Sequence, residues 1–176
     1  MKKNIKYSYL IAAVVLISAL FAGYIGSNGN SKKVIIHLVS NVKKADGPVC
    51  VAFDVALVNL KLGNKVEFLF DADAAWNLKF TKGKNDFDRY EVPADLKKLV
   101  SEQVKDKSLL SVKNFEDFLK LLHDKGATIS VNGTWNLLTS VEKEVKGKRN
   151  IPNYIEPITL QELASRINNA DVYYSY

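Results

Sequence analysis

Short apolar runs alternate along this chain with longer segments of helical spacing, and this alternation constrains the fold more than any other feature. Residues 34–39 form a nearly continuous apolar run, which is typical of a parallel strand buried on both faces. Further strands are predicted at residues 65–70, 128–131, 153–156 and 172–175. Parallel strands need a crossover connection, normally a helix, so the segments between these runs complete the prediction.

Helical signals occupy the intervening segments. Pro48 suits a first helical position and Gly63 a helix end, with a valine and leucine stripe between them. Three further helices are marked by Pro93, by an Asn114 cap with Gly126 at the far end, and by a capping box of Thr159 and Glu162. Another helix is predicted from the spacing of Trp135, Leu138, Val141 and Val145. Residues 71–76 are predicted as a short helix or loop, and residues 80–92 as a polar loop.

Strands that alternate with helices predict an α/β fold. We expect a five-stranded, mainly parallel sheet with helices on both faces, which gives a three-layer α/β/α arrangement. The chain of 176 residues, 47% hydrophobic and 25% charged, is compatible with one globular domain. A single cysteine excludes an internal disulfide framework and a cluster of cysteine metal ligands.

The N-terminal segment carries a targeting signal. Residues 9–25 are 17 residues without a charge, and they follow Lys2, Lys3 and Lys6. The length allows either an uncleaved single-pass anchor or a secretory signal peptide. Neither Ala22 nor Gly23 is preceded by a small residue two places earlier, which favours the anchor. We therefore expect a protein of the inner membrane whose domain faces the periplasm or outside, or a protein secreted to the periplasm after signal cleavage.

Residues 26–31 read as a linker, which gives a predicted anchor or signal segment at residues 1–30 and an α/β domain at residues 31–176. Three of the six net positive charges belong to Lys2, Lys3 and Lys6. The remaining excess is too small to indicate nucleic-acid binding. The basic loops at residues 43–44 and 146–149 are interpreted as solvated surface.

Four segments carry a resemblance to a known family: VIIHLV, PVCVAFDVALVNLKLGNKVEFLF, FEDFLKLLHDKGATISVNGTW and ITLQELASRINNADVYYSY. In this order, over residues 34–176, they resemble the DsrE-like family of small α/β domains. The resemblance implies the three-layer fold, a link to sulfur relay with a possible sulfur-metabolism partner, and assembly as a homo-trimer or homo-hexamer.

This sequence lacks the cysteine that carries sulfur in the family it resembles. Active members carry it just after the third strand, where this sequence has Asn132, and Trp135 stands where some members have a second cysteine. A carboxamide cannot carry a persulfide. The resemblance therefore implies the fold without the usual thiol chemistry, and the chain is expected not to be an enzyme of that kind.

Cys50 is the remaining thiol and the one candidate catalytic residue. With Pro48 as the first helical residue, Cys50 falls in the first turn, where the helix dipole favours a thiolate. Asp54 lies one turn further on and disfavours a second negative charge. Free cysteine is also commonly buried, so a structural role and a relocated sulfur-carrying role both stay open.

Polar residues at the predicted strand ends form the candidate ligand site. Ser40, Asn41, Asn132, Gly133 and Thr134 follow the first and third strands and are expected at the carboxyl edge of the sheet, where ligands bind in open α/β folds. The alternative is that Asn132 and Gly133 form an ordinary turn.

Three other residues at these strand ends could bind a metal, though weakly. They are His37, Asp71 and Asp73, and turn chemistry is the commoner role for such aspartates. His123, at a helix end, is assigned a structural role. The sequence has no Gly-rich phosphate loop, nucleophile elbow or paired-histidine helix, and no cofactor is predicted.

Three functions remain in contention. The first is an exported, membrane-tethered DsrE-like domain that binds a ligand or partner without thiol chemistry. The second is a sulfur-relay protein that uses Cys50 in place of the missing cysteine. The third is a structural subunit of an oligomer, which would leave apolar surface around Trp76, Tyr173 and Tyr174.

Overall fold

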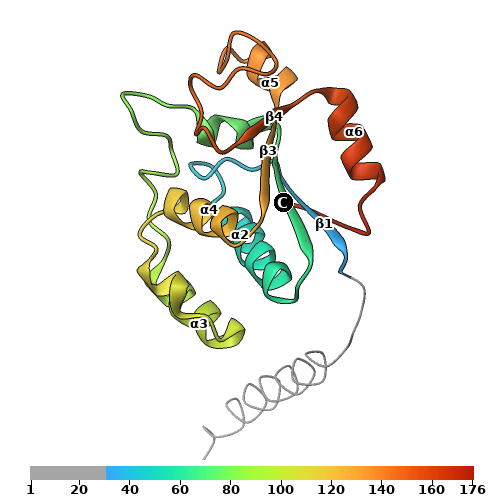
Figure 1. The fold of residues 1–176 in the computed structure, drawn as a ribbon. Helices are drawn as coiled ribbons and strands as arrows, with labels where there is room; N and C mark the ends of the chain where they lie inside the picture. Colours follow the sequence, from blue (N-terminus) through green and yellow to red (C-terminus); the bar gives the residue numbers. More distant parts are fainter. Residues whose placement is uncertain (1–30) are drawn as a thin grey trace, which may run out of the picture. The chain divides into compact units, whose positions relative to one another are not determined.

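Five strands form one parallel sheet in the computed structural model, which describes residues 31–176, and four of them lie where the sequence predicts them (Figure 1). The strands are β1 (Lys33–Leu38), β2 (Lys65–Phe70), β3 (Thr128–Asn132), β4 (Glu156–Ile158) and β5 (Val172–Ser175). Their order is β4-β3-β2-β1-β5, and every neighbouring pair is parallel. The predicted fold class is confirmed. The predicted anchor or signal segment lies outside the described residues.

Helices connect the strands in the expected order. They are α2 (Asp46–Lys61), α3 (Ala94–Val104), α4 (Phe115–Asp124), α5 (Gly133–Leu138) and α6 (Leu160–Asn168), with two 3₁₀ helices, η1 (Ala72–Leu78) and η2 (Lys107–Ser111). Within residues 31–176, none of these helices is both long and apolar enough to cross a membrane.

The direction of the strand order explains why both faces of the sheet are covered. From β1 to β4 the chain steps one way across the sheet, and α6 then returns it from β4 to β5 at the opposite edge. Right-handed crossovers in opposite directions place their helices on opposite faces. Figure 1 accordingly shows α2, α3 and α4 on one side of the strands and α6 on the other.

The face beneath α2 and α4 holds the larger core. Phe53 of α2 lies at its centre, fully buried, with ring centroids 4.9–5.5 Å from four other phenylalanines. These are Phe68 of β2, Phe87 of the 80–92 segment, and Phe115 and Phe118 of α4. One side chain therefore links four segments that are far apart in the sequence.

The opposite face has a smaller apolar core and a row of charges. Ile35, Leu69 and Ile158 pack against α6. Beside them Arg166 of α6 donates to Glu67 at 2.8 Å and to Glu156 at 2.9 Å. Within residues 31–176 the helix that covers this face is α6. The charged side chains beside it stay partly exposed to solvent.

Two predicted elements differ in extent from the structure, besides α2, which begins at Asp46 and not at Pro48. The helix expected through Trp135–Val145 ends at Leu138, because Ser140 has a left-handed backbone (φ 57°) that turns the chain. Val141 is still buried, which accounts for the misleading spacing. The strand expected at residues 153–156 instead forms at Glu156–Ile158, since a turn from Pro152 to Ile155 precedes it. Pro157 is tolerated there because β4 is an edge strand.

Replacing the central aromatic ring tests this packing. Phe53→Ala should lower the free energy of unfolding by about 3–5 kcal/mol, because it removes a fully buried ring and leaves a cavity. Urea denaturation measures the change. Leu138→Ala, at a position 72% exposed, should change stability by less than about 0.5 kcal/mol. Equal effects of the two substitutions would contradict the described core.

Candidate functional site

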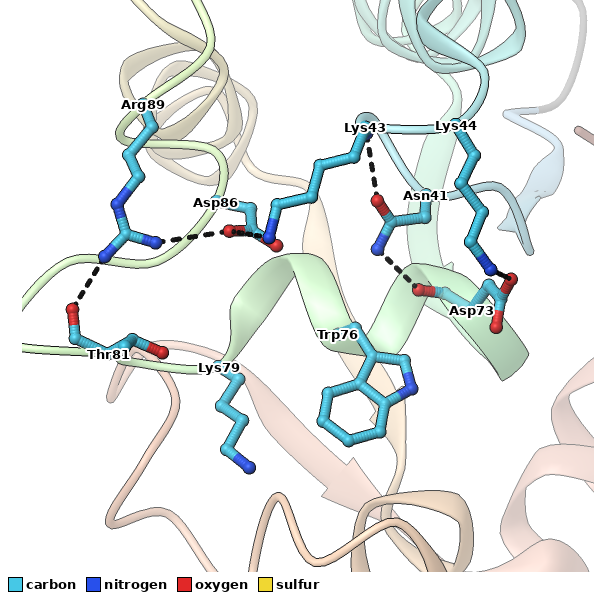
Figure 2. Close-up of a pocket in the computed structure, with 9 residues that line it drawn as sticks. All are labelled: Asn41, Lys43, Lys44, Asp73, Trp76, Lys79, Thr81, Asp86 and Arg89. Carbon is cyan, nitrogen blue, oxygen red and sulfur yellow. Dashed lines mark hydrogen bonds and ion pairs between the residues drawn. The ribbon is translucent and has the colours of Figure 1, made fainter.

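A cleft of about 480 Å³ opens beyond the carboxyl ends of β1 and β2 (Figure 2). It lies between the β1–α2 loop, η1 and the segment after η1. Its lining consists of four cations, two carboxylates, an indole and two neutral polar residues: Lys43, Lys44, Lys79, Arg89, Asp73, Asp86, Trp76, Asn41 and Thr81. The charges leave an excess of two positive charges. The volume falls within the range of small-molecule sites, about 300–1,000 Å³.

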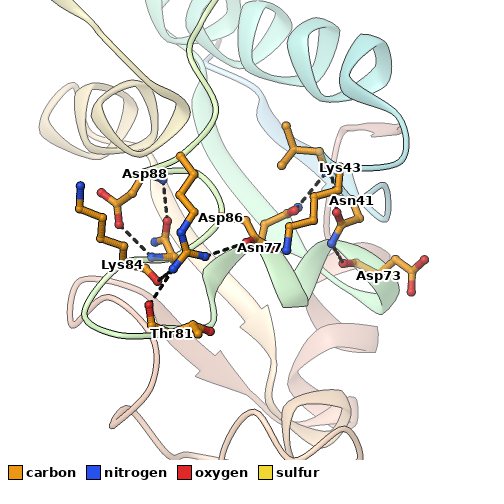
Figure 3. A network of polar contacts seen from close by, with 11 residues as sticks. Asn41, Lys43, Asp73, Asn77, Thr81, Lys84, Asp86 and Asp88 are labelled. Atoms are coloured by element: carbon orange, nitrogen blue, oxygen red, sulfur yellow. Dashed lines mark hydrogen bonds and ion pairs between the residues drawn. The ribbon is translucent and has the colours of Figure 1, made fainter.

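Two asparagines fix the β1–α2 loop against η1 (Figure 3). The Asn41 amide accepts from the Lys43 backbone N–H at 2.9 Å and donates to the Asp73 carbonyl at 3.2 Å. The fully buried Asn77 accepts from the Val42 backbone N–H at 3.0 Å and donates to the Ser40 carbonyl at 3.2 Å. Backbone groups in a loop lack the partners that a helix or a strand provides, and these asparagine side chains supply some of them. The hydrogen bonds therefore hold the loop against η1.

The carboxylates of the cleft partly neutralise its cations. Asp86, buried, binds both Lys43 at 2.8 Å and Arg89 at 3.2 Å. Arg89 also donates to the Thr81 carbonyl at 2.7 Å. Asp73 binds Lys44 at 2.7 Å, where both side chains are largely exposed.

Lys79 is held differently from the other three cations. Its Nζ donates to the Ser140 carbonyl at 3.3 Å and lies 5.0 Å from the centroid of the Trp76 ring, within cation–π range. Within the described part of the chain it has no carboxylate partner, so its charge is balanced least.

The predicted ligand-binding residues separate into two groups. Asn41 lines the cleft, and the Ser40 carbonyl is used by Asn77 beside it. Asn132 instead caps α5 by accepting from the Trp135 backbone N–H, and it donates to Asp71 at 2.9 Å. A Cβ on Gly133 would stand 1.9 Å from the Val145 carbonyl oxygen, so the close approach predicted for this glycine is made by its own chain. Thr134 follows it in α5 and does not line the cleft.

The three weak metal candidates do not come together. His37 Nε2 lies 3.4 Å from Asp71, whereas Asp73 turns to Lys44. Within residues 31–176, no group of three acidic, histidine or cysteine side chains is placed to hold a metal. The His37 ring also contacts the Tyr173 hydroxyl through Nδ1 at 2.5 Å.

Hydrogen bonds decide the ionisation of Asp71. Burial opposes the charged form, but the nearby His37 ring and hydrogen bonds from Asn132 and from the Ala72 backbone N–H outweigh it and lower the pKa of Asp71. Its carboxylate therefore stays ionised and links the ends of β1, β2 and β3.

Cys50 sits where thiol chemistry is disfavoured. The helix begins at Asp46 and not at Pro48, so Cys50 is beyond the first turn and loses the predicted advantage of the helix N-terminus. Burial, and then the charges of Asp54 and Asp46, raise the pKa of the thiol to about 11. The predicted opposition of Asp54 is confirmed, and burial also raises the pKa of Asp54 itself to about 7.

Sequence reasoning missed most of the cleft. Lys43 and Lys44, interpreted as solvated surface, are exposed but also line it. The sequence assigns Trp76 only to candidate apolar surface and predicts no role for Lys79 or Arg89, all three of which line the cleft. The available signal was the clustering of basic residues and an aromatic in segments that directly follow two neighbouring strands.

Comparison with known proteins adds a similarity of fold. No family model matches the sequence, and no curated protein matches it. Among solved structures, the YchN protein from E. coli superposes with a TM-score of 0.49 at 13% identity, over 83% of this chain and 99% of that one. The fold class rests on the sheet topology described above and not on this likeness.

The geometry around Cys50 predicts an unreactive thiol. With a pKa of about 11, Cys50 should react with iodoacetamide at pH 8 at least about tenfold more slowly than a small-molecule thiol, and its rate should rise steadily towards pH 11. Asp54→Asn should speed the reaction because it removes a like charge, whereas Asp124→Asn, a charge that does not act on Cys50, should not.

Mass spectrometry after exposure to a polysulfide provides the second measurement. Cys50 should gain no 32 Da persulfide in the folded protein. A stoichiometric adduct, or fast alkylation at neutral pH, would favour the sulfur-relay alternative over a structural thiol.

Proposed function

We propose that residues 31–176 form a DsrE-like binding module that holds a small anionic ligand in the cleft and uses no thiol chemistry. The single observation that carries the proposal is the excess of positive charge in a cleft of ligand size at the carboxyl edge of a parallel sheet. That edge is where ligands bind in open α/β folds. The high pKa of Cys50 supports the second part of the proposal.

The cleft would recognise charge more than shape. Lys43 and Lys44 are 52% and 71% exposed, so each contributes a screened attraction, and an anion must compete with Asp86 and Asp73 for them. An anion that binds Lys79 displaces no carboxylate, because among the described residues this side chain contacts the Ser140 carbonyl and the Trp76 ring. We therefore expect modest affinity, with Lys79 contributing most, and binding that weakens as salt rises.

Titration with inorganic pyrophosphate tests the proposal. Isothermal calorimetry of residues 31–176 at low salt should give one binding site, and Lys79→Gln should weaken it by about three- to tenfold. Asp73→Asn should strengthen it, since the substitution releases Lys44. Lys120→Gln, an exposed lysine on α4 paired with Asp124, is the matched control and should have no effect.

Two results would overturn the assignment. One is the absence of pyrophosphate binding to a folded domain. The other is binding that responds equally to Lys79→Gln and Lys120→Gln, because net charge alone would then account for it.

We also propose that residues 9–25 tether this module to the inner membrane, with the cleft in the periplasm or outside. The support is the uncharged run behind Lys2, Lys3 and Lys6. Assembly as a trimer or hexamer, and a sulfur-metabolism partner, remain predictions from the family resemblance.

Protease treatment of spheroplasts tests the tether. The full chain should fractionate with the inner membrane, keep its N-terminal residues, and lose residues 31–176 to external protease. A soluble periplasmic form that starts within residues 22–31 would instead establish signal cleavage, and protection of the domain would contradict export.

A further inference from the structure

Trp76 gives the cleft a fixed aromatic surface. Asp71 caps η1 by accepting from the Ala72 backbone N–H at 2.7 Å, and the neighbours Ala74, Ala75, Asn77 and Leu78 are buried. Trp76 packs partly against the core and partly lines the cleft. An indole anchored in this way loses little conformational freedom when a ligand contacts its exposed part.

The cations of the cleft lie on both sides of η1, whereas the aromatic ring lies on one side. Figure 2 shows Trp76 and Lys79 projecting from one side of the helix, while Lys43, Asp86 and Arg89 lie along the other. Lys79 places a positive charge 5.0 Å from the Trp76 centroid. A ligand that lies across η1 would therefore meet an aromatic surface with one cation at one end, and further cations at the other.

From this arrangement we propose that the ligand is a flat aromatic anion of the nucleoside phosphate class, with its ring against Trp76 beside Lys79 and its phosphates toward Lys43 and Arg89. The inference rests on the proposed function, since it names the ligand of the same cleft. Aromatic side chains stack on any base, and cations attract the phosphate charges.

The cleft does not distinguish one base from another. An amide side chain reads a base edge only when its donor and its acceptor are both free. Asn41 is the one amide in the lining, and both ends of it are engaged by the Lys43 backbone N–H and the Asp73 carbonyl. ADP and GDP should consequently bind with affinities within about threefold of each other.

Comparison of ADP with inorganic pyrophosphate and adenosine isolates the aromatic contribution. Calorimetry should show ADP binding about tenfold more tightly than pyrophosphate, and adenosine binding more weakly than either. Trp76→Leu should reduce ADP affinity about tenfold and bring the ratio of ADP to pyrophosphate affinity close to one, while Trp76→Phe should recover most of that ratio. Circular dichroism melts of each variant establish that it is folded.

Fluorescence of the intact indole keeps the test independent of those substitutions. The chain has two tryptophans, so Trp135→Phe leaves Trp76 as the one reporter. ADP should quench its emission with the same midpoint as calorimetry gives.

The outcomes separate the two proposals. If pyrophosphate and ADP bind equally and ADP leaves Trp76 emission unchanged, the aromatic ligand is excluded while anion binding stands. If neither binds to the folded domain, anion binding itself fails and this inference falls with it. A preference for ADP over GDP greater than tenfold would contradict the engaged state of Asn41.

Discussion

The packing of Phe53 between the sheet and the helices is the contact on which the rest of the domain depends. Its ring joins α2 to β2, to α4 and to Phe87 of the 80–92 segment. That last contact has a functional consequence, because Phe87 lies between Asp86, which lines the cleft, and the turn that carries Arg89. A polar segment is thus held against the core by one buried aromatic residue, and this contact positions one wall of the cleft.

The carboxylates in the cleft set its net charge and the competition that a ligand anion meets. Asp86 is buried and pairs with both Lys43 and Arg89. Its negative charge offsets the repulsion between these two cations. Asp73 performs the same role for Lys44 near the surface, where water screens the pair. A ligand anion therefore competes with internal partners at two positions, and among the cleft residues that the structure describes it finds a cation without a carboxylate partner at Lys79 alone.

The sequence predicted the layers well and the site poorly, for physical reasons that differ. Burial on both faces gives parallel strands a strong apolar signal, so β1, β2 and β3 were recognisable from residues alone. Val141 misled because a buried residue in an irregular turn has the same spacing as a helical one. The cleft depends on how loops fold back over η1, which Asn77 and Phe87 decide through contacts to residues far along the chain.

The polar residues at the carboxyl edge differ in whether their charges and hydrogen bonds are already satisfied. Asp71 and Asn132 engage each other and the backbone, and His37 contacts Asp71 and Tyr173, so these residues join the ends of three strands. Asp71 and Asn132 consequently have little capacity left for a ligand. Asn132, at the position where the family resemblance expects a sulfur-carrying thiol, belongs to this satisfied group. On the η1 side of the same edge, cations outnumber carboxylates by two, and that excess is not consumed by the fold. Binding through charge at η1 is therefore compatible with the absence of a thiol after β3, because the two depend on different sides of the edge.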